Sequence, residues 1–349
     1  MHDLAQYISR EFCIRVEDDK VQEISENTHH SLAFCRTFDR LVVFKRFEAL
    51  AKIKGWREMP SHISTLKSLQ KLSNFIVGQK GGSRIGELGE LSDIGGRLEI
   101  SEMQNVECAR DALRANMKDK RHLDELSLAW RDEGTNDVIQ SGVLNNLQPH
   151  PNLKQLTIAG YPGVAFPDWI GGGSSLSNLV TLLLWTCENC SSLPPLGQLP
   201  SLKHLSISGL KGVERVGREF YGDASSSIAS KPSFPFLQTL RFDRMDNWEQ
   251  WLCCGCEFHR LQELYIKKCP KLTGKLPEEL PSLKKLEIDG CRGLLVASLQ
   301  VPAIRELKMV GILTKVFAGV IISQRSKGRL TTESQRKSIR SQIARISGH

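Results

Sequence analysis

Apolar residues along the chain recur in an L-x-x-L-x-L pattern, in which Ile, Phe or Met can take the last place. The pattern begins at eight positions, which are residues 123, 153, 179, 202, 237, 261, 283 and 304. Most of the intervals lie near the ~20 to 29 residues expected of a leucine-rich repeat. Each L-x-L core predicts a short strand whose leucines point inward while the x residue faces solvent. One repeat cannot bury such a row alone, so we expect the repeats to stack.

The predicted fold is an α/β solenoid, a leucine-rich-repeat horseshoe with short parallel strands on its concave face, spanning residues 55–311. Weaker forms of the pattern predict further repeats that end in strands within residues 59–78 and 95–106. The longest interval, 35 residues between the repeats that begin at 202 and 237, contains a Gly, Ser and Pro-rich stretch. We interpret that stretch, residues 221–236, as an insertion that forms a flexible surface loop.

Segments between the predicted strands indicate what covers the convex side. Residues 191–203 and 274–285 combine leucine with proline, which fixes φ and removes a hydrogen-bond donor, so we expect turns and irregular arcs there. Residues 105–120 differ, because four apolar side chains recur at helical spacing and predict a true helix. These four residues are Val106, Ala109, Leu113 and Met117.

The first residues of the chain have the pattern of a helix inside a domain. Apolar side chains at Leu4, Ala5, Ile8 and Phe12 form one stripe, which needs a partner surface to bury against. We therefore expect residues 1–30 to be a small helical remnant of a domain that lies upstream. Residues 21–54 show no clear period, and residues 31–54 form an unassigned connector.

The net charge of +8 raises the question of nucleic-acid binding. Residues 325–349 hold seven Lys or Arg against one Glu, so this stretch carries +6 and the remainder of the chain only +2. A solvated, disordered tail over residues 312–349 explains such a terminus better than a docking device does. We predict no nucleic-acid partner.

Export and membrane signals are missing from the sequence. The N-terminal residues lack the basic start and apolar run of a signal peptide, and the apolar stretch Val310–Ile322 is too short to span a bilayer and includes Lys315. Ten cysteines without an export signal favour free thiols, and we predict a cytoplasmic chain. Three of the cysteines share one repeat position that suits the core, namely Cys187, Cys269 and Cys291.

Two cysteine clusters raise the alternative of a zinc site. One consists of Cys253, Cys254, Cys256 and His259, and the other of Cys187 and Cys190. Tetrahedral zinc needs four converging ligands, whereas two repeats separate these clusters, so we predict no metal. The sequence has no HExxH, GxSxG or other nucleophile-and-base signature, so we predict that the chain is not an enzyme.

Several stretches together resemble plant nucleotide-binding leucine-rich-repeat immune receptors of the coiled-coil class. They are MHDLAQYIS, CIRVEDDK, EMPSHISTLKSLQKLSNFIVG, LPPLGQLPSLKHLSISGLKGVERVGREFYG and FPFLQTLRFDRMDNWEQW. The resemblance covers residues 1 to about 30 and 55 to about 310. It implies a role in plant defence, in which the repeats bind a pathogen effector or a guarded host protein and restrain an upstream ADP/ATP switch domain.

The resemblance also assigns the first three residues. The family's switch domain ends with a Met-His-Asp tripeptide, which here is Met1, His2 and Asp3, and its histidine lies near the ADP β-phosphate in the resting state. The phosphate-binding pattern GxxxxGK[ST] occurs nowhere in the sequence. We therefore expect ADP or ATP binding only in a longer family member, and we expect this chain to be a truncated or partly mis-spliced product.

Candidate binding residues come from the two outward positions of each strand. The first column reads Ser127, Thr157, Leu183, Ser206, Arg241, Tyr265, Glu287 and Lys308, and the second reads Ala129, Ala159, Trp185, Ser208, Asp243, Lys267, Asp289 and Val310. Large aromatic and charged side chains dominate interface energies, which selects Trp185, Arg241, Asp243, Tyr265 and Lys267 as partner-binding candidates. A solvated strand surface is an equally good explanation for any one of them.

The alternative function of the chain is that of a separate leucine-rich-repeat scaffold or ubiquitin-ligase adaptor, or a non-signalling truncated product.

Overall fold

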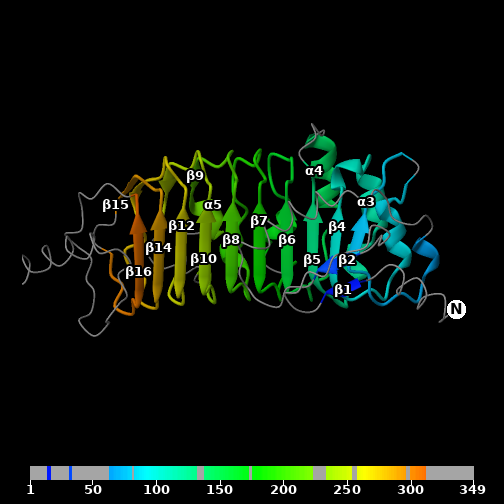
Figure 1. Cartoon of the computed structure of the whole chain (residues 1–349), viewed down its shortest axis with the longest axis horizontal. Coiled ribbons are helices and arrows are strands. Elements are labelled where there is room, and N and C mark those ends of the chain that lie inside the picture. Colours follow the sequence, from blue (N-terminus) through cyan, green and yellow to red (C-terminus); the bar gives the residue numbers. More distant parts are fainter. Residues whose placement is uncertain are drawn as a thin grey trace, which may run out of the picture.

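The structure, a computed structural model, describes residues 14–16, 31–33 and 63–311, with gaps at 81, 132–136, 173–174, 223–232, 254–257 and 296–298. A ten-stranded parallel sheet runs along the whole molecule, with its strands in chain order (Figure 1). The strands are β3 (Asn74–Ile76), β4 (Gly96–Ser101), β5 (Leu123–Ala129), β6 (Gln155–Ala159), β7 (Thr181–Trp185), β8 (His204–Ser208), β10 (Thr239–Asp243), β12 (Glu263–Lys267), β14 (Lys285–Asp289) and β16 (Glu306–Val310). Each predicted L-x-L core lies in one of them, which confirms the predicted solenoid of short parallel strands.

Strand register is continuous from β5 to β16, so that equivalent residues of successive repeats lie side by side. The first leucine of each L-x-L core pairs with the next along one line, which is Leu126, Leu156, Leu182, Leu205, Leu240, Leu264, Leu286 and Leu307. All but the last of these side chains are buried. Burying a leucine side chain stabilises the fold by ~1.5 to 3 kcal/mol, and the repeats share this contribution because each covers its neighbour.

A second, smaller parallel sheet lies in the segments that follow the C-terminal strands. Its members, in spatial order, are β15 (Gly293–Leu295), β13 (Thr273–Lys275), β11 (Gln250–Trp251) and β9 (Arg215–Val216). The leucine pattern does not predict this sheet, because strands of two or three residues leave no readable alternation. The irregular segment predicted for residues 274–285 therefore begins inside strand β13. The irregular segment predicted for residues 191–203 contains one turn of 3-10 helix, η6.

Helices are short and lie between strands. The α-helices are α3 (Ala109–Arg114), α4 (Asp137–Asn145) and α5 (Arg218–Tyr221), and the 3-10 helices are η1 (Ile63–Thr65), η2 (Ile85–Glu90), η3 (Met103–Asn105), η4 (Met117–Asp119), η5 (Asp168–Ile170) and η6 (Leu196–Gln198). Within the described residues, no helix has the length and apolar character needed to cross a bilayer.

The helix predicted within residues 105–120 is present but shorter than its pattern suggests. Helix α3 ends at Arg114, and Asn116 then adopts a left-handed backbone with φ of 49° before a separate 3-10 turn. Val106 and Met117 are buried, whereas Leu113 is 61% exposed, so the four apolar residues do not share one buried face. The left-handed residue interrupts the helical period, so that Leu113 and Met117 need not lie on the same face.

Near the N-terminus the structure describes one pair of strands. β1 (Ile14–Val16) and β2 (Ser31–Ala33) are parallel and lie in segments assigned above to the domain remnant and the connector. The amphipathic helix predicted for residues 1–12 lies outside the described residues, and so does the tail over 312–349. Those two assignments remain predictions.

Both ends of the insertion between β8 and β10 are anchored in the core by aromatic rings. Tyr221 and Phe234 are buried, with ring centroids 6.0 Å apart, and each also lies within 6.0 Å of the Phe258 ring. Trp251 Nε1 donates a hydrogen bond of 2.8 Å to the Tyr221 hydroxyl. The interior of the insertion, residues 223–232, lies outside the described residues. The anchored ends let β8 and β10 pair in register across the longest interval of the sequence.

A left-handed residue follows each strand of the main sheet from β6 to β16. Glycine occupies this position at Gly160, Gly209, Gly290 and Gly311, with φ between 69° and 71°, while Thr186, Arg244 and Lys268 adopt φ of 51° or 52°. Glycine adopts this conformation without the cost of ~1 to 2 kcal/mol that other residues pay. The room for a side chain at this position differs between repeats. At Gly160 there is none, because an added Cβ would lie 2.4 Å from the Trp130 carbonyl oxygen.

We predict that Gly160→Ala destabilises the protein more than Gly290→Ala. Both substitutions put alanine into a left-handed backbone, at about 1 kcal/mol, but the nearest atom to a Cβ on Gly290 is 3.6 Å away. The clash at position 160 adds about 1 to 3 kcal/mol. Urea unfolding of the two variants measures the difference, and equal free energies of unfolding would show that the tight approach to Trp130 is absent.

Candidate functional site

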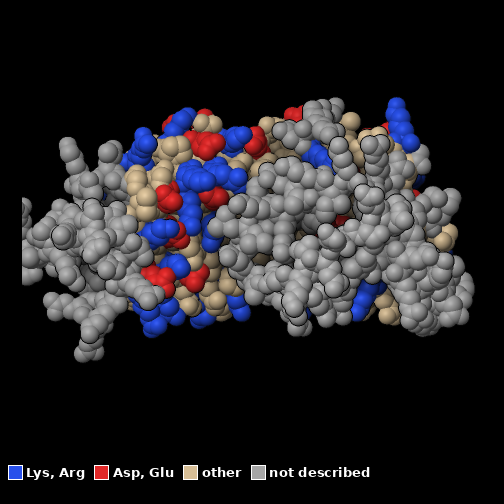
Figure 2. Space-filling model, in the orientation of Figure 1, with Lys and Arg blue, Asp and Glu red and all other residues tan. Residues whose placement is uncertain are grey.

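Outward-facing residues of the main sheet form a surface that we call the strand face. Strand pairing brings the first predicted column into one line from Ser127 to Lys308, and the second column into a line from Ala129 to Val310. Over β5 to β8 these columns hold small or apolar side chains. Over β10 to β16 all of them except Tyr265 and Val310 are charged, and Figure 2 shows basic and acidic side chains interspersed in this region.

The charged patch of the strand face comprises residues from four neighbouring strands. Its members are Arg241, Asp243, Glu263, Tyr265, Lys267, Lys285, Glu287, Glu306 and Lys308. Tyr265 lies at the centre, with the Arg241 guanidinium carbon 4.3 Å from its ring centroid. The ammonium nitrogens of Lys267 and Lys285 lie 5.6 Å and 5.8 Å from the same centroid. Such cation–π contacts stabilise by ~0.5 to 2 kcal/mol each, depending on desolvation.

The Tyr265 hydroxyl is fixed by a carboxylate. It donates a hydrogen bond of 3.0 Å to Glu263 Oε2, and the residue is largely buried. Burial raises the pKa of Tyr265, and the negative charge of Glu263 beside the hydroxyl raises it further. The phenol is therefore neutral at physiological pH, and its ring presents a fixed surface to the cations around it.

Glu287 links the next two strands through two ion pairs. Its Oε1 atom accepts hydrogen bonds from Lys308 Nζ at 2.7 Å and from Lys267 Nζ at 3.0 Å. Burial, with 11% of the side chain exposed, acts to raise the pKa of Glu287, but the hydrogen bonds and charges of the two lysines together lower it below its usual value. The carboxylate stays charged and holds both lysines in place.

Arg241 differs from the other cations of the patch. Lys267 and Lys308 pair with Glu287, and Lys285 pairs with Glu306 at 2.9 Å. Within the described residues the Arg241 guanidinium has no carboxylate partner, and its Nε is buried without a hydrogen-bond acceptor. A planar guanidinium can bind a carboxylate by donating two parallel hydrogen bonds, so Arg241 can still bind a carboxylate of a partner.

Not all five predicted candidates share one location. Arg241 and Asp243 on β10 and Tyr265 and Lys267 on β12 occupy neighbouring strands, and the Asp243 carboxylate accepts a hydrogen bond of 3.4 Å from the Ser208 hydroxyl. Trp185 lies on β7 and is only 7% exposed. Strand β8 separates Trp185 from the charged patch, so it does not join the other four residues.

Three charged residues of the patch were absent from the prediction. Glu263, Lys285 and Glu306 are the first residues of their strands, two positions before the first outward column. The same alternation that defines the other columns extends to this position, so the signal was present in the sequence. A third outward column would have included them.

The cysteine-rich segments show no arrangement typical of zinc binding within the described part of the chain, where no cluster of three possible ligands is found. Cys254 and Cys256 lie outside that part. Cys187 and Cys190 are buried, and burial raises the pKa of Cys187 to about 12 and that of Cys190 as well. Cys187, Cys269 and Cys291 are fully buried, which confirms the predicted core position. Met1, His2 and Asp3 lie outside the described residues, so their assignment is untested.

The chain has the features of a leucine-rich-repeat protein. Its parallel strands pair in register, its repeating leucines are buried, and its outward positions vary from repeat to repeat. Residues 85–210 match the family described as R13L1/DRL21 LRRs. The chain is 43% identical over 237 residues to the disease resistance RPP13-like protein 1 of Arabidopsis thaliana, a match that covers 64% of this chain and 22% of the relative. It is 36% identical over 234 residues to the disease resistance protein RGA2 of Solanum bulbocastanum, covering 64% and 23%. The repeats are therefore homologous to the leucine-rich repeats of plant disease resistance proteins.

The matched region spans only about a fifth of the length of these curated relatives. Among solved structures, a chain of the Toll–Spatzle complex of Drosophila matches with 13% identity and a TM-score of 0.26, covering 70% of this chain and 43% of that one. A TM-score this low adds nothing to the fold described above.

We predict that Glu287→Gln destabilises the protein by about 1 to 2 kcal/mol at pH 7, because two lysines lose their shared carboxylate. A glutamate whose folded pKa is lowered stabilises the fold above the unfolded value of ~4.3, and this contribution disappears as the pH falls through the folded value. The difference between variant and parent should therefore shrink below about pH 4.3.

Thermal unfolding across this pH range provides the measurement. Glu278→Gln is the matched control, because Glu278 pairs with Lys275 at 3.5 Å on an exposed turn and should contribute less than about 0.5 kcal/mol. A pH-independent difference between the Glu287 variant and the parent would show that the carboxylate does not act through its charge.

Proposed function

We propose that the chain provides the partner-binding surface of a plant innate immune receptor, and that its charged patch binds a pathogen effector or a host protein that effectors modify. The observation that carries the proposal is the Arg241 guanidinium, which lies over Tyr265 and has no carboxylate partner among the described residues. Arginine and tyrosine are the residue types most often responsible for binding energy at protein interfaces.

Neighbouring ion pairs support this role for the patch. Glu287 already holds Lys267 and Lys308, and Glu263 already holds the Tyr265 hydroxyl, so these side chains need little ordering when a partner arrives. Preorganised side chains reduce the entropy that binding would otherwise cost, by ~0.5 to 1.5 kcal/mol for each side chain. The mixed charges favour a partner with a complementary arrangement rather than any polyanion.

A carboxylate is the partner group that Arg241 fits best. An aspartate or glutamate of the partner would pair with the Arg241 guanidinium, which lies over the largely buried Tyr265 ring. The repeat domain then acts by binding, with no catalytic step assigned to the chain.

Regulation forms the second part of the proposal. Homology of the repeats to disease resistance proteins, together with the Met1-His2-Asp3 tripeptide, supports a cytoplasmic receptor in which the repeats restrain an ADP/ATP switch domain. Partner binding at the charged patch would release that restraint only if the partner binds the active state more tightly than the resting state. The nucleotide itself would be held by the upstream domain.

We predict that Arg241→Ala, Tyr265→Ala and Lys267→Ala each weaken partner binding by ~1 kcal/mol or more, about fivefold. Arg241→Ala is the sharpest of the three, because it breaks no ion pair within the described residues and should lower stability only by the ~0.5 to 2 kcal/mol of its cation–π contact with Tyr265. Lys267→Ala also releases Glu287 and should lower stability as well as affinity.

Tagged forms of the chain, expressed in leaves with and without infection, test the prediction by comparing the proteins that each form retains. Arg215→Ala is the matched control, because it removes an exposed arginine from β9 in the second sheet. A genuine partner should be retained by the parent and by Arg215→Ala, and reduced with Arg241→Ala. Identical sets of retained proteins from all three forms would contradict a role for the charged patch.

A further inference from the structure

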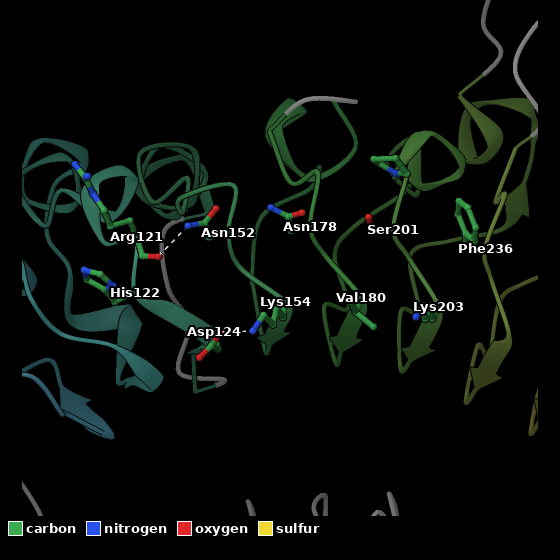
Figure 3. Close-up of a pocket in the computed structure, with 11 residues that line it drawn as sticks. Arg121, His122, Asp124, Asn152, Lys154, Asn178, Val180, Ser201, Lys203 and Phe236 are labelled. Atoms are coloured by element: carbon green, nitrogen blue, oxygen red, sulfur yellow. Dashed lines mark hydrogen bonds and ion pairs between the residues drawn. The ribbon is translucent and has the colours of Figure 1, made fainter.

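A groove of about 750 Å³ crosses the starts of strands β5 to β10, apart from the charged patch. Figure 3 shows its side chains in two rows that run across successive repeats. One row holds Asp124, Lys154, Val180 and Lys203, and the facing row includes Asn152, Asn178 and Ser201. Arg121 and Phe236 lie at opposite ends of the groove.

Repeat geometry explains why the groove forms. In each repeat, the first leucine of the L-x-x-L-x-L pattern is buried, as Leu153, Leu179 and Leu202 illustrate. The residues directly before and after that leucine then become the two rims. Backbone hydrogen bonds of 2.8 to 2.9 Å join one rim, from Lys154 N to Asp124 O, from Val180 N to Lys154 O and from Lys203 N to Val180 O.

The groove is predominantly basic. Lys154 pairs with Asp124 at 2.8 Å, whereas Arg121 and Lys203 have no ion pair within the described residues. The side chains of Asn178 and Ser201, which can donate hydrogen bonds, also face the groove without an assigned partner in that part of the chain. Three cations and one carboxylate leave a net charge of +2, apart from any contribution of His122.

An apolar contact lies at the far end of the groove. Phe236 is 41% exposed, and the Arg260 guanidinium carbon lies 4.7 Å from its ring centroid. Parallel strands are ~4.8 Å apart, so the five main-sheet strands from β5 to β10 extend over about 19 Å, and an extended chain covers this distance with about six residues.

We propose that this groove binds an extended acidic segment of a partner protein, with carboxylates at Arg121 and Lys203 and an apolar residue against Phe236. The proposal concerns a second surface, so it does not depend on the charged patch. An acidic chain matches the net charge, the unpaired cations and the length of the groove together, whereas a basic or apolar segment would leave Arg121 and Lys203 unpaired.

Fluorescence anisotropy of the full chain with two labelled peptides tests the proposal. The probe is a fluorescein-labelled peptide of alternating Glu and Ala that ends in Phe, and the comparison peptide has Gln in place of each Glu. We expect the acidic peptide to bind and the neutral one to bind at least tenfold more weakly. Affinity should fall as salt is raised, because exposed charges are screened.

Variants of the rim give the sharper result. Arg121→Ala and Lys203→Ala should each weaken the acidic peptide about two- to fivefold, the range typical of exposed charge pairs. Asp124→Asn should strengthen it by a similar factor, because Lys154 is released from its internal ion pair. A gain of affinity on removing a carboxylate is not expected from a merely structural residue.

Lys284→Ala is the matched control. Lys284 occupies the same repeat position as Lys154 and Lys203, but it lies beyond the groove and its ammonium bonds Gln262 Oε1 at 2.9 Å. This variant should leave affinity unchanged. Equal weakening by Lys284→Ala, equal binding of the neutral peptide, or no effect of the rim variants would overturn the proposal, since general attraction to a chain of net charge +8 would then explain the binding.

Discussion

The parallel hydrogen-bond ladder of the main sheet is the constraint on which the rest of the molecule depends. Because every strand from β5 to β16 pairs with its neighbour in the same register, the inward leucines form one continuous core. A shift of one residue between two strands would turn those leucines outward and expose them to water. Burial of the leucines and pairing of the backbone therefore specify each other.

Surface chemistry follows from the same constraint. Once the leucines are inward, each repeat has fixed outward positions, and residues far apart in sequence become neighbours on the strand face. Arg241 contacts Tyr265 in this way, as Lys308 contacts Glu287. The groove at the strand starts arises from the residues on either side of a buried leucine. Two candidate binding surfaces of different charge thus come from one repeating unit, because substitutions at outward positions leave the core unchanged.

Much of this architecture could be predicted from the sequence, because the leucine period directly reflects burial. All eight predicted strands are present, and the two columns lie in register as predicted. The expectation that column residues face solvent is wrong for several of them, which are buried, namely Ser127, Thr157, Trp185, Ser206, Ser208, Tyr265 and Glu287. Features without a period were missed. The second sheet has strands of two or three residues. One left-handed residue, Asn116, separates helix α3 from Met117, so Leu113 is exposed while Met117 is buried.

Candidate site residues were only partly predictable. Column membership identifies which side chains face outward, but it does not show which cations are already neutralised. Glu287 forms ion pairs with both Lys267 and Lys308, whereas Arg241 has no carboxylate partner among the described residues. This difference between the cations is visible only in the side-chain positions of the structure. The burial of Trp185 was likewise not evident from its column, since an outward position in a strand is expected to be exposed.

Disulfide cross-linking across the longest interval of the sequence tests the central claim, which is continuous register. Ser206 and Arg241 are register partners on β8 and β10, so Ser206→Cys with Arg241→Cys should form a disulfide under mild oxidation, identified by mass spectrometry of the linked peptides. Ser206→Cys with Asp243→Cys is displaced by two residues, a separation of about 8 Å that a disulfide does not bridge. The account predicts cross-linking of the first pair only. Preferential cross-linking of the second pair would contradict it.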